Sequence, residues 1–201
     1  MNDAKELTMT AERKAPEVAM TPKTPEKTDG SPMLLHVCCA PCAAGCVERL
    51  LATGREIRLF YSNSNIATKE EFERRLDSVE KLARIFDLPL EVDDYDHGAW
   101  RKVIAGLEAE PERGRRCPLC FWHSLRRTAE RAAAIGAKFA TTLTVSPHKS
   151  SRVIFGVAGA WHHFEPWDFK KQDGFKRSRE LARQYDFYLQ NFCGCEFSIR
   201  D

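Results

Sequence analysis

Seven of the eight cysteines in this 201-residue chain fall into three tight groups. The groups are Cys38-Cys39-Ala40-Pro41-Cys42, Cys117-Pro118-Leu119-Cys120 and Cys193-Gly194-Cys195. A single cysteine is often just a small buried hydrophobic residue, but packing alone rarely clusters so many. In a reducing compartment, closely spaced cysteines are more often metal ligands or redox catalysts than structural disulfides. The eighth cysteine, Cys46, lies one helical turn after Cys42 and is expected to face the core.

The spacing of the cysteines bears on the kind of metal site. Four-cysteine sites suit zinc or iron-sulfur clusters, because both prefer soft thiolates. Structural zinc usually takes two C-x-x-C pairs, and only Cys117 and Cys120 have that spacing. Adjacent cysteines such as Cys38 and Cys39 reach separate irons of one cluster more easily than one tetrahedral zinc ion. The pattern favours a cube-type iron-sulfur cluster, with zinc as the alternative.

The third group is different, because Cys193 and Cys195 are separated by a single glycine. A disulfide between them would close a very small ring, and a bond far from relaxed geometry is easily reduced. This pair is therefore predicted to be a redox catalyst or an electron relay rather than a structural brace.

The cysteine groups belong to longer motifs that are jointly specific. These are LLHVCCAPC at 34–42, YSNSNI at 61–66, EPERGRRCPLCF at 110–121, TTLTVSPHK at 141–149 and NFCGCEFS at 191–198. Across residues 34–198 the chain resembles the QueH type of epoxyqueuosine reductase. The resemblance implies an enzyme that reduces epoxyqueuosine to queuosine at the wobble position of tRNA with a [4Fe-4S] cluster. Its partners would be that tRNA and an unidentified electron donor.

The same resemblance assigns roles to the cysteines. It implies that the cluster ligands are Cys38, Cys39, Cys117 and Cys120, and that the redox-active pair is Cys193 and Cys195. Members of the family also hold an additional iron ion near the cluster, and some carry an aspartate at the position of Cys42. Cys42 is therefore a candidate metal ligand whose role stays open.

The resemblance also implies a nucleotide α-hydrolase-like (HUP-type) fold, in which a glycine-rich loop after the first strand usually holds ATP. Here that turn reads Cys-Cys-Ala-Pro-Cys. Proline removes a backbone donor, and cysteines replace the glycines that would let the backbone approach phosphate. We therefore expect no use of ATP.

Reducing an epoxide to an alkene consumes two electrons and two protons and releases the oxygen as water, so a proton donor is needed. The candidates are His36, Tyr61, His148 and Asp168. Each also has a purely structural interpretation. His36 can be a hydrogen-bonded histidine within a strand, Tyr61 an aromatic residue at a strand end, His148 part of a helix cap, and Asp168 an exposed acid in a loop.

Candidate substrate contacts lie near the same motifs. The residues are Ser146, Lys149, Arg115 and Trp100. The first two follow the fourth predicted strand, where a basic side chain and helix-start amides can grip a tRNA phosphate. Arg115 flanks the C-x-x-C pair, and Trp100 is one of several aromatic residues that can stack on an unstacked base. A plain helix cap and core packing are the alternatives. A basic stretch near the last cysteines, with Arg179 at its end, is a further candidate for the RNA surface.

The elements that must position these residues alternate along the chain. Apolar runs predict strands over 33–37, 57–61, 89–92 and 138–143, and helical periodicity predicts helices over 43–54, 69–87 and 120–135. Thr68 is expected to cap the second helix, with Glu71 three residues on. Alternating strands and helices predict a doubly wound, mostly parallel α/β sheet with the site at the carboxyl ends of its strands.

Composition limits the domain organisation. Residues 1–31 hold several prolines, interleaved charges and no aromatic residue, and are expected to form a disordered tail before one domain over 32–201. No stretch approaches the roughly 18 apolar residues that cross a bilayer, so we expect a cytoplasmic protein without a membrane partner. A net charge of +2 permits nucleic-acid binding without arguing for it.

Two other functions remain open on the sequence alone. One is a zinc-stabilised RNA-binding module without catalysis. The other is a sulfur-transfer tRNA enzyme that uses a cysteine persulfide, which would need ATP to activate the base. Colour separates the first from a [4Fe-4S] protein, because a zinc protein is colourless.

Overall fold

A four-stranded parallel sheet forms the centre of the computed structural model, which describes residues 30–199. Its strands are β1 (Met33–His36), β2 (Ile57–Tyr61), β3 (Leu90–Val92) and β4 (Lys138–Thr141), in the spatial order β3-β2-β1-β4. β1 pairs with β2 on one side and with β4 on the other. The strand order reverses between β1 and β4, and such a switch point is where open α/β sheets usually bind their ligands.

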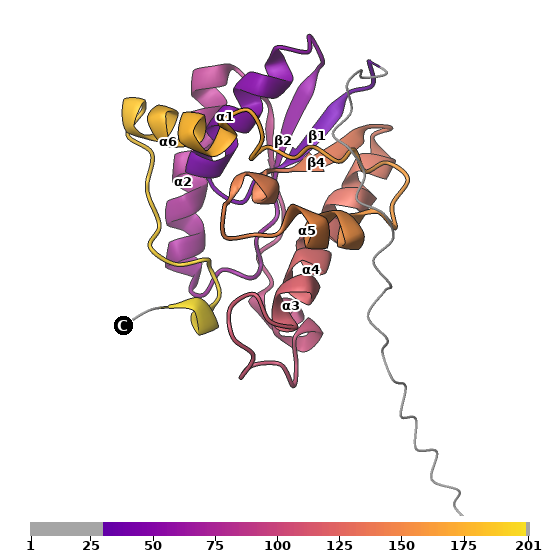
Figure 1. The fold of residues 1–201 in the computed structure, drawn as a ribbon, viewed down its shortest axis with the longest axis vertical. Helices are drawn as coiled ribbons and strands as arrows, with labels where there is room; N and C mark the ends of the chain where they lie inside the picture. Colours follow the sequence, from indigo (N-terminus) through magenta and orange to yellow (C-terminus); the bar gives the residue numbers. More distant parts are fainter. Residues whose placement is uncertain (1–29, 200–201) are drawn as a thin grey trace, which may run out of the picture.

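Helices cover both faces of this sheet (Figure 1). They are α1 (Ala40–Leu51), α2 (Lys69–Phe86), α3 (His97–Val103), α4 (Arg116–Ala134), α5 (Ser151–Ala158) and α6 (Gly174–Gln184), with short 3-10 helices η1 (Thr142–Val145) and η2 (Glu196–Ser198). Successive strand residues alternate between two cores: Leu35 packs with the α1, α2 and α6 side, and Leu34 with the α4 and α5 side. The doubly wound α/β fold expected from the sequence is confirmed.

The four expected strands and the three expected helices are present, although the first helix spans Ala40–Leu51 rather than 43–54, and the sequence patterns did not indicate α3, α5 or α6. Two further differences are informative. The helix predicted from Cys120 begins at Arg116, so Cys117 lies in its first turn. Pro118 is compatible with this start. The backbone nitrogens of the first helical turn donate no hydrogen bond within the helix, so a proline, which lacks the N–H group, loses none there. The strand predicted to reach Leu143 ends at Thr141, where η1 turns the chain. Thr68 caps α2 as expected, by accepting a hydrogen bond from the Glu71 nitrogen.

The last described segment, residues 185–199, runs back along α2 and ends beside α3 (Figure 1). The Tyr188 nitrogen donates to the Ser78 hydroxyl, and the Tyr188 hydroxyl donates to the Glu71 carboxylate at 3.1 Å. At the far end, Arg101 of α3 pairs with Glu196 at 2.6 Å. These bonds bring the third cysteine group back to the sheet.

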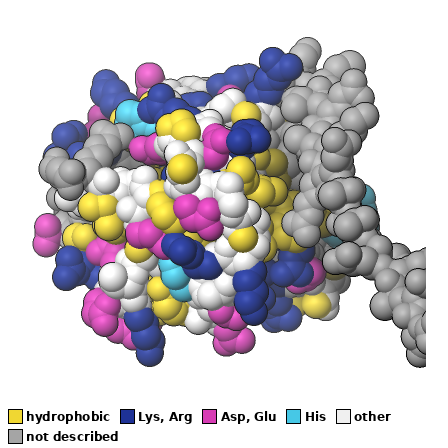
Figure 2. Space-filling view, turned by 90° about the horizontal axis from the view of Figure 1, so that it is seen from below, with side chains coloured by type: hydrophobic (Ala, Val, Ile, Leu, Met, Phe, Trp, Pro, Cys, Tyr) yellow, Lys and Arg dark blue, Asp and Glu magenta, His cyan; other side chains and the backbone are white. Residues whose placement is uncertain are grey.

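The predicted tail, residues 1–31, lies outside the described residues except for Gly30 and Ser31. No helix within residues 30–199 is long and apolar enough to cross a membrane. Figure 2 shows the molecule from below: hydrophobic, basic and acidic side chains are interspersed on this face, and no single charge dominates it.

Candidate functional site

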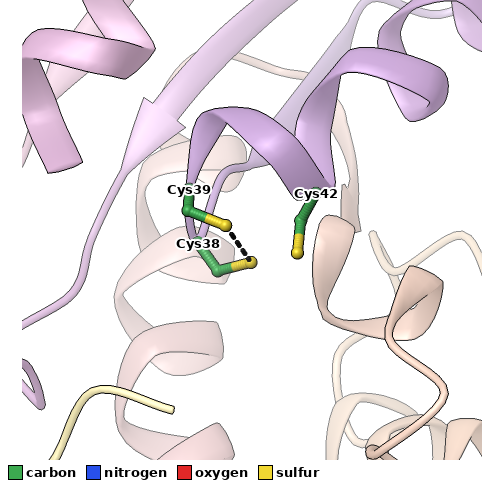
Figure 3. Close-up of side chains that lie close together, drawn as sticks. All are labelled: Cys38, Cys39 and Cys42. Atoms are coloured by element: carbon green, nitrogen blue, oxygen red, sulfur yellow. Dashed lines mark hydrogen bonds between the residues drawn. The ribbon is translucent and has the colours of Figure 1, made fainter. Parts of the chain in front are cut away.

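Three cysteine thiols converge at the carboxyl end of β1. Cys38 follows the strand, Cys39 is the N-cap residue of α1, and Cys42 lies in the first turn of the helix. Their sulfur atoms lie within 4.8 Å of one another, and those of Cys38 and Cys39 are 4.0 Å apart. Figure 3 shows all three sulfurs below the first turn of α1. The Cys39 N-cap makes no side-chain capping bond, so its sulfur is not occupied in closing the helix.

Two polar side chains from other elements hold these thiols. The Thr142 hydroxyl accepts a bond from the Cys38 nitrogen at 3.1 Å and donates to the Cys38 sulfur at 3.2 Å. The Gln190 amide donates to the Cys39 sulfur at 3.0 Å. Bonds donated by Cys38 first, then by Cys42 and Gln190, hold the pKa of Cys39 well below its usual range. Donating its proton toward Cys38 and Cys39 raises the pKa of Cys42. The group is therefore built to carry negative charge on at least one sulfur.

Three adjoining pockets connect this triad to the other cysteines. The inner pocket is lined by Cys38, Cys42, Cys120 and Cys193. The side pocket is lined by Cys117, Cys120, Cys193 and Cys195. The outer pocket, of about 270 Å³, opens beside Cys42 and Cys193. All seven clustered cysteines therefore lie on one connected hollow or directly beside it, because Cys39 borders Cys38 and Cys42. Within residues 30–199, only Cys38, Cys39 and Cys42 form a close group of potential metal ligands.

Lys149 is the cation that faces these thiols. It lines all three pockets, as does Cys193, so the pockets meet at these two residues. Burial lowers the pKa of the Lys149 ammonium, but electrostatic interaction with the nearby cysteines, first Cys193 and then Cys38 and Cys42, outweighs burial and holds the pKa above its usual range. The ammonium stays charged and offsets the negative charge of the sulfurs.

The Cys193-Gly194-Cys195 segment is fixed by its backbone. The Ala67 nitrogen donates to the Gly194 carbonyl at 2.7 Å, and Arg75 donates to the Cys193 carbonyl at 3.1 Å. Gly194 has φ of +149°, and a Cβ there would lie 2.9 Å from the Asn65 amide nitrogen. Only glycine fits this position without strain. Cys193 and Cys195 are both free thiols, and burial raises the pKa of Cys195.

Besides Lys149, three residues expected at the site line its pockets: Ser146, His148 and, at the inner pocket, His36. Ser146 lies at the outer pocket and accepts a bond from the His148 nitrogen at 3.2 Å. His148 lines the outer and side pockets, and its Nδ1 accepts a bond from Arg113 at 3.0 Å. In neutral His148 the proton is consequently on Nε2.

Four expected residues do not line any of the three pockets. The Tyr61 hydroxyl donates to the Phe72 carbonyl inside the core, and Asp168 accepts a bond from the Ser151 hydroxyl at 2.8 Å. Arg115 is exposed and pairs with Glu110 at 2.7 Å. Trp100 is fully buried against Cys195 and Ile104, so it presents no ring face to a base in this structure. The prediction that Trp100 stacks on a base is wrong, because its ring is packed in the core.

The two remaining candidates also have structural roles. The Nε2 of His36 contacts the Ser62 carbonyl, which can only accept, and its Nδ1 contacts the Thr141 hydroxyl at 2.8 Å. This neutral ring is fully bonded, and burial lowers its pKa. Cys46 is completely buried and donates to the Cys42 carbonyl, as expected for a core cysteine.

Sequence reasoning missed three residues that position the thiols: Thr142, Gln190 and Arg75. Thr142 belongs to the TTLTVSPHK motif and directly follows β4, which pairs with β1. Pairing of these two strands would have predicted that Thr142 lies close to Cys38. Gln190 directly precedes the NFCGCEFS motif. Arg75 is one of several charged residues on α2, so the sequence does not single it out. Its role appears only in the fold, where the chain returns along α2 and Arg75 bonds to the Cys193 carbonyl.

This donor set fits a thiolate-bound metal group. Soft thiolates select iron-sulfur clusters, zinc or copper(I), and three converge here while others line the same hollow. The hydrogen bonds from Thr142 and Gln190 to sulfur are of the kind that tunes such centres. Chemically, the arrangement can hold a metal group, store electrons on free thiols and bind an anionic ligand near Lys149.

Comparison with known proteins matches the chain to one family. Residues 33–201 match the family model described as epoxyqueuosine reductase QueH. A curated protein of that name from Streptococcus pyogenes serotype M1 is 37% identical over 181 residues, covering 84% of this chain and 70% of the relative. One from Acinetobacter baylyi is 34% identical, covering 89% and 84%, and one from Haemophilus influenzae is 34% identical, covering 94% and 80%.

Proposed function

Because the chain belongs to the epoxyqueuosine reductase QueH family, we propose that it reduces epoxyqueuosine to queuosine at the wobble position of tRNA. The observation that best supports this activity is the convergence of three cysteine groups from distant parts of the chain on one hollow at the switch point of the sheet. A tRNA substrate and eight free cysteines also fit a cytoplasmic enzyme.

The proposed reaction removes the epoxide oxygen. Both carbon-oxygen bonds break, a carbon-carbon double bond forms, and two electrons and two protons convert the oxygen to water. A [4Fe-4S] cluster, when bound, supplies electrons one at a time. The electrons come ultimately from an external electron donor that is not yet identified.

Four cysteines are the proposed cluster ligands: Cys38, Cys39, Cys117 and Cys120. Cys38 and Cys120 line the same inner pocket, which supports a shared ligand set drawn from the β1–α1 turn and the start of α4. Cys42 contributes a third sulfur beside Cys38 and Cys39, and is the proposed ligand of an additional iron ion. Lys149 supplies a fixed positive charge next to the negatively charged thiolates.

Cys193 and Cys195 are the proposed redox pair. Their oxidation to a disulfide releases two electrons and two protons, which balances the reduction of one epoxide. Both thiols line the side pocket together with Cys117 and Cys120, so the proposed pair borders the proposed ligands. An external reductant then restores the two thiols.

Proton delivery and substrate holding are assigned to the pocket residues. His148 is the proposed proton donor, because its Nε2 proton is not used by Arg113. Ser146 and Lys149 are the proposed contacts to the nucleotide. Tyr61 and Asp168 are less suitable, because the Tyr61 hydroxyl is bonded in the core and Asp168 lies away from the pockets.

The activity is tested by incubating protein purified without oxygen with tRNA that carries epoxyqueuosine and a chemical reductant, and then analysing the nucleosides. Conversion to queuosine supports the proposal. A colourless protein that contains zinc, binds tRNA and converts nothing would support a zinc-stabilised RNA-binding module instead. Consumption of ATP with sulfur transfer to the base would support the third function.

A further inference from the structure

The rim of the outer pocket carries two exposed hydrophobic side chains. Phe175 on α6 is 40% exposed, and Leu189 on the returning segment is 41% exposed. Both line the pocket, which extends inward to Cys42 and Cys193. Large exposed hydrophobic side chains next to a cavity are typical of a binding surface rather than of bare solvent-facing protein.

Contacts between α6 and α1 hold the rim residues of α6 in a fixed position. Arg177 makes a double ion pair with Glu48 of α1, at 2.7 and 2.8 Å. A Cβ at Gly45 of α1 would lie 2.6 Å from the Ser178 hydroxyl, so the two helices touch at that point. Phe175 and Arg179 are four residues apart and share one face of α6, and both line the pocket. The aromatic ring and the guanidinium are therefore displayed side by side on a rigid helix.

Two cations line the outer pocket, Arg179 and Lys149. Within residues 30–199, neither makes an ion pair with a carboxylate. The guanidinium of Arg113, at the adjoining side pocket, bonds to His148 rather than to an acid. Most other described arginines are paired, among them Arg55, Arg127 and Arg131. One acid, Glu112, lies at the rim. An arginine without a carboxylate partner, next to an exposed aromatic ring, is complementary to phosphodiester charge and a base face.

We propose that this rim binds the single-stranded anticodon loop of the tRNA. Phe175 stacks on a base that flanks the wobble nucleoside, Arg179 holds a loop phosphate, and the wobble nucleoside enters the outer pocket toward Cys193. This inference rests on the proposed function, because it takes the tRNA as the occupant. Stacking of unpaired bases on aromatic side chains is the usual way in which proteins hold RNA loops.

The test measures binding and turnover separately. Phe175→Ala should weaken binding of epoxyqueuosine tRNA by roughly tenfold or more, because base-aromatic stacking is lost, while Phe175→Tyr should retain near-parental affinity. Arg179→Gln should weaken binding and reduce the dependence of log Kd on log salt by roughly one unit or slightly less. Neither variant should change the iron content. Binding is followed by fluorescence anisotropy, and turnover by nucleoside analysis with a chemical reductant.

A matched control is Trp122→Ala, which removes an aromatic ring of 38% exposure that lies on α4 and lines none of the three pockets. It should bind tRNA normally. Parental affinity in both Phe175→Ala and Arg179→Gln would overturn the proposal. So would a defect that appears only when a protein replaces the chemical reductant, because the rim would then bind the electron donor. If the parental protein binds tRNA through this rim but reduces none of it, the proposed function fails and the docking surface stands.

Discussion

At the scale of single residues, the chemistry depends on which thiols are held together and by what. Cys38 has a hydroxyl bonded to its sulfur, Cys39 has an amide bonded to its sulfur, and Cys42 completes the triad. Cys46, only four residues further along the same helix, is buried in the core and bonded to a backbone carbonyl. The two kinds of cysteine provide a direct comparison.

Replacing a proposed ligand should remove the cluster. Alanine at Cys38, Cys39, Cys117 or Cys120 is expected to abolish or severely reduce the iron and sulfide content, because a lost thiolate opens the cluster to solvent. Cys46→Ala should keep full iron content and cost about 1 kcal/mol of stability, for the loss of a small buried side chain. The reverse pattern, with iron lost in Cys46→Ala and kept in Cys117→Ala, would show that the ligand assignment is wrong.

The redox pair should behave differently from the ligands. Serine at Cys193 or Cys195 is expected to leave the iron content and the visible spectrum near those of the parent, while turnover falls by orders of magnitude. Cluster loss in both serine variants would instead make these thiolates ligands. Full activity in both would reduce the pair to a structural detail.

The Thr142 hydroxyl should tune the centre without being required for its assembly. Thr142→Val removes one hydrogen bond to the Cys38 sulfur and is expected to lower the reduction potential, because bonds donated to sulfur stabilise the more negative, reduced state. Thr144→Val is the matched control, because the Thr144 hydroxyl donates to the Trp167 carbonyl and to no sulfur. Equal potentials in the two variants and the parent, measured by redox titration, would contradict this role.

At the scale of elements, the site is made where β1 and β4 diverge and where the chain returns along α2. The turn after β1 supplies three thiols, the start of α4 supplies two, and the returning segment supplies the last two. Hydrogen bonds from Thr142 and Gln190 fix the turn after β1, and a bond from Arg75 fixes the returning segment.

Glycine at position 194 is the backbone feature on which the returning segment depends. Gly194→Ala should destabilise the protein by about 1–3 kcal/mol, because alanine is strained at this positive φ and would strike Asn65. It should also impair turnover by shifting Cys193 and Cys195. Gly54→Ala shares the positive φ but meets nothing within 4 Å, so it should lose stability and keep full turnover. Urea unfolding and nucleoside assays of both variants distinguish the two effects, and equal turnover in both would contradict the positioning role.

The sequence predicts the sheet and its main helices well, because apolar runs and helical periodicity are local signals. It also identifies every clustered cysteine. Local signals cannot show that Arg75 holds the Cys193 carbonyl, because the two residues are far apart in the chain and meet only in the fold. For the same reason Trp100 looks available for stacking in the sequence but is packed in the core. Pairings between distant segments are what the sequence alone leaves undetermined.

At the scale of the whole molecule, the described structure includes the last two residues of the predicted tail, Gly30 and Ser31. The Ser31 carbonyl accepts a bond from Arg55 at 2.7 Å, and the Pro32 carbonyl accepts one from Lys138 at 3.0 Å. Residues 1–29 have no apolar pattern with which to pack on the domain, so deleting them should leave the melting temperature, iron content and turnover essentially unchanged. A large drop in melting temperature would show that the deleted residues stabilise the domain.

The central claim is that one cysteine-held centre delivers electrons to the epoxide of a tRNA nucleoside. The most direct measurement is a single-turnover experiment: the protein is reduced without oxygen, the reductant is removed, and epoxyqueuosine tRNA is added. We predict that the visible spectrum returns to its oxidised form while queuosine appears, with electrons lost by the protein matching product formed. A reduced centre that stays reduced in the presence of bound tRNA, with no queuosine formed, would contradict the account.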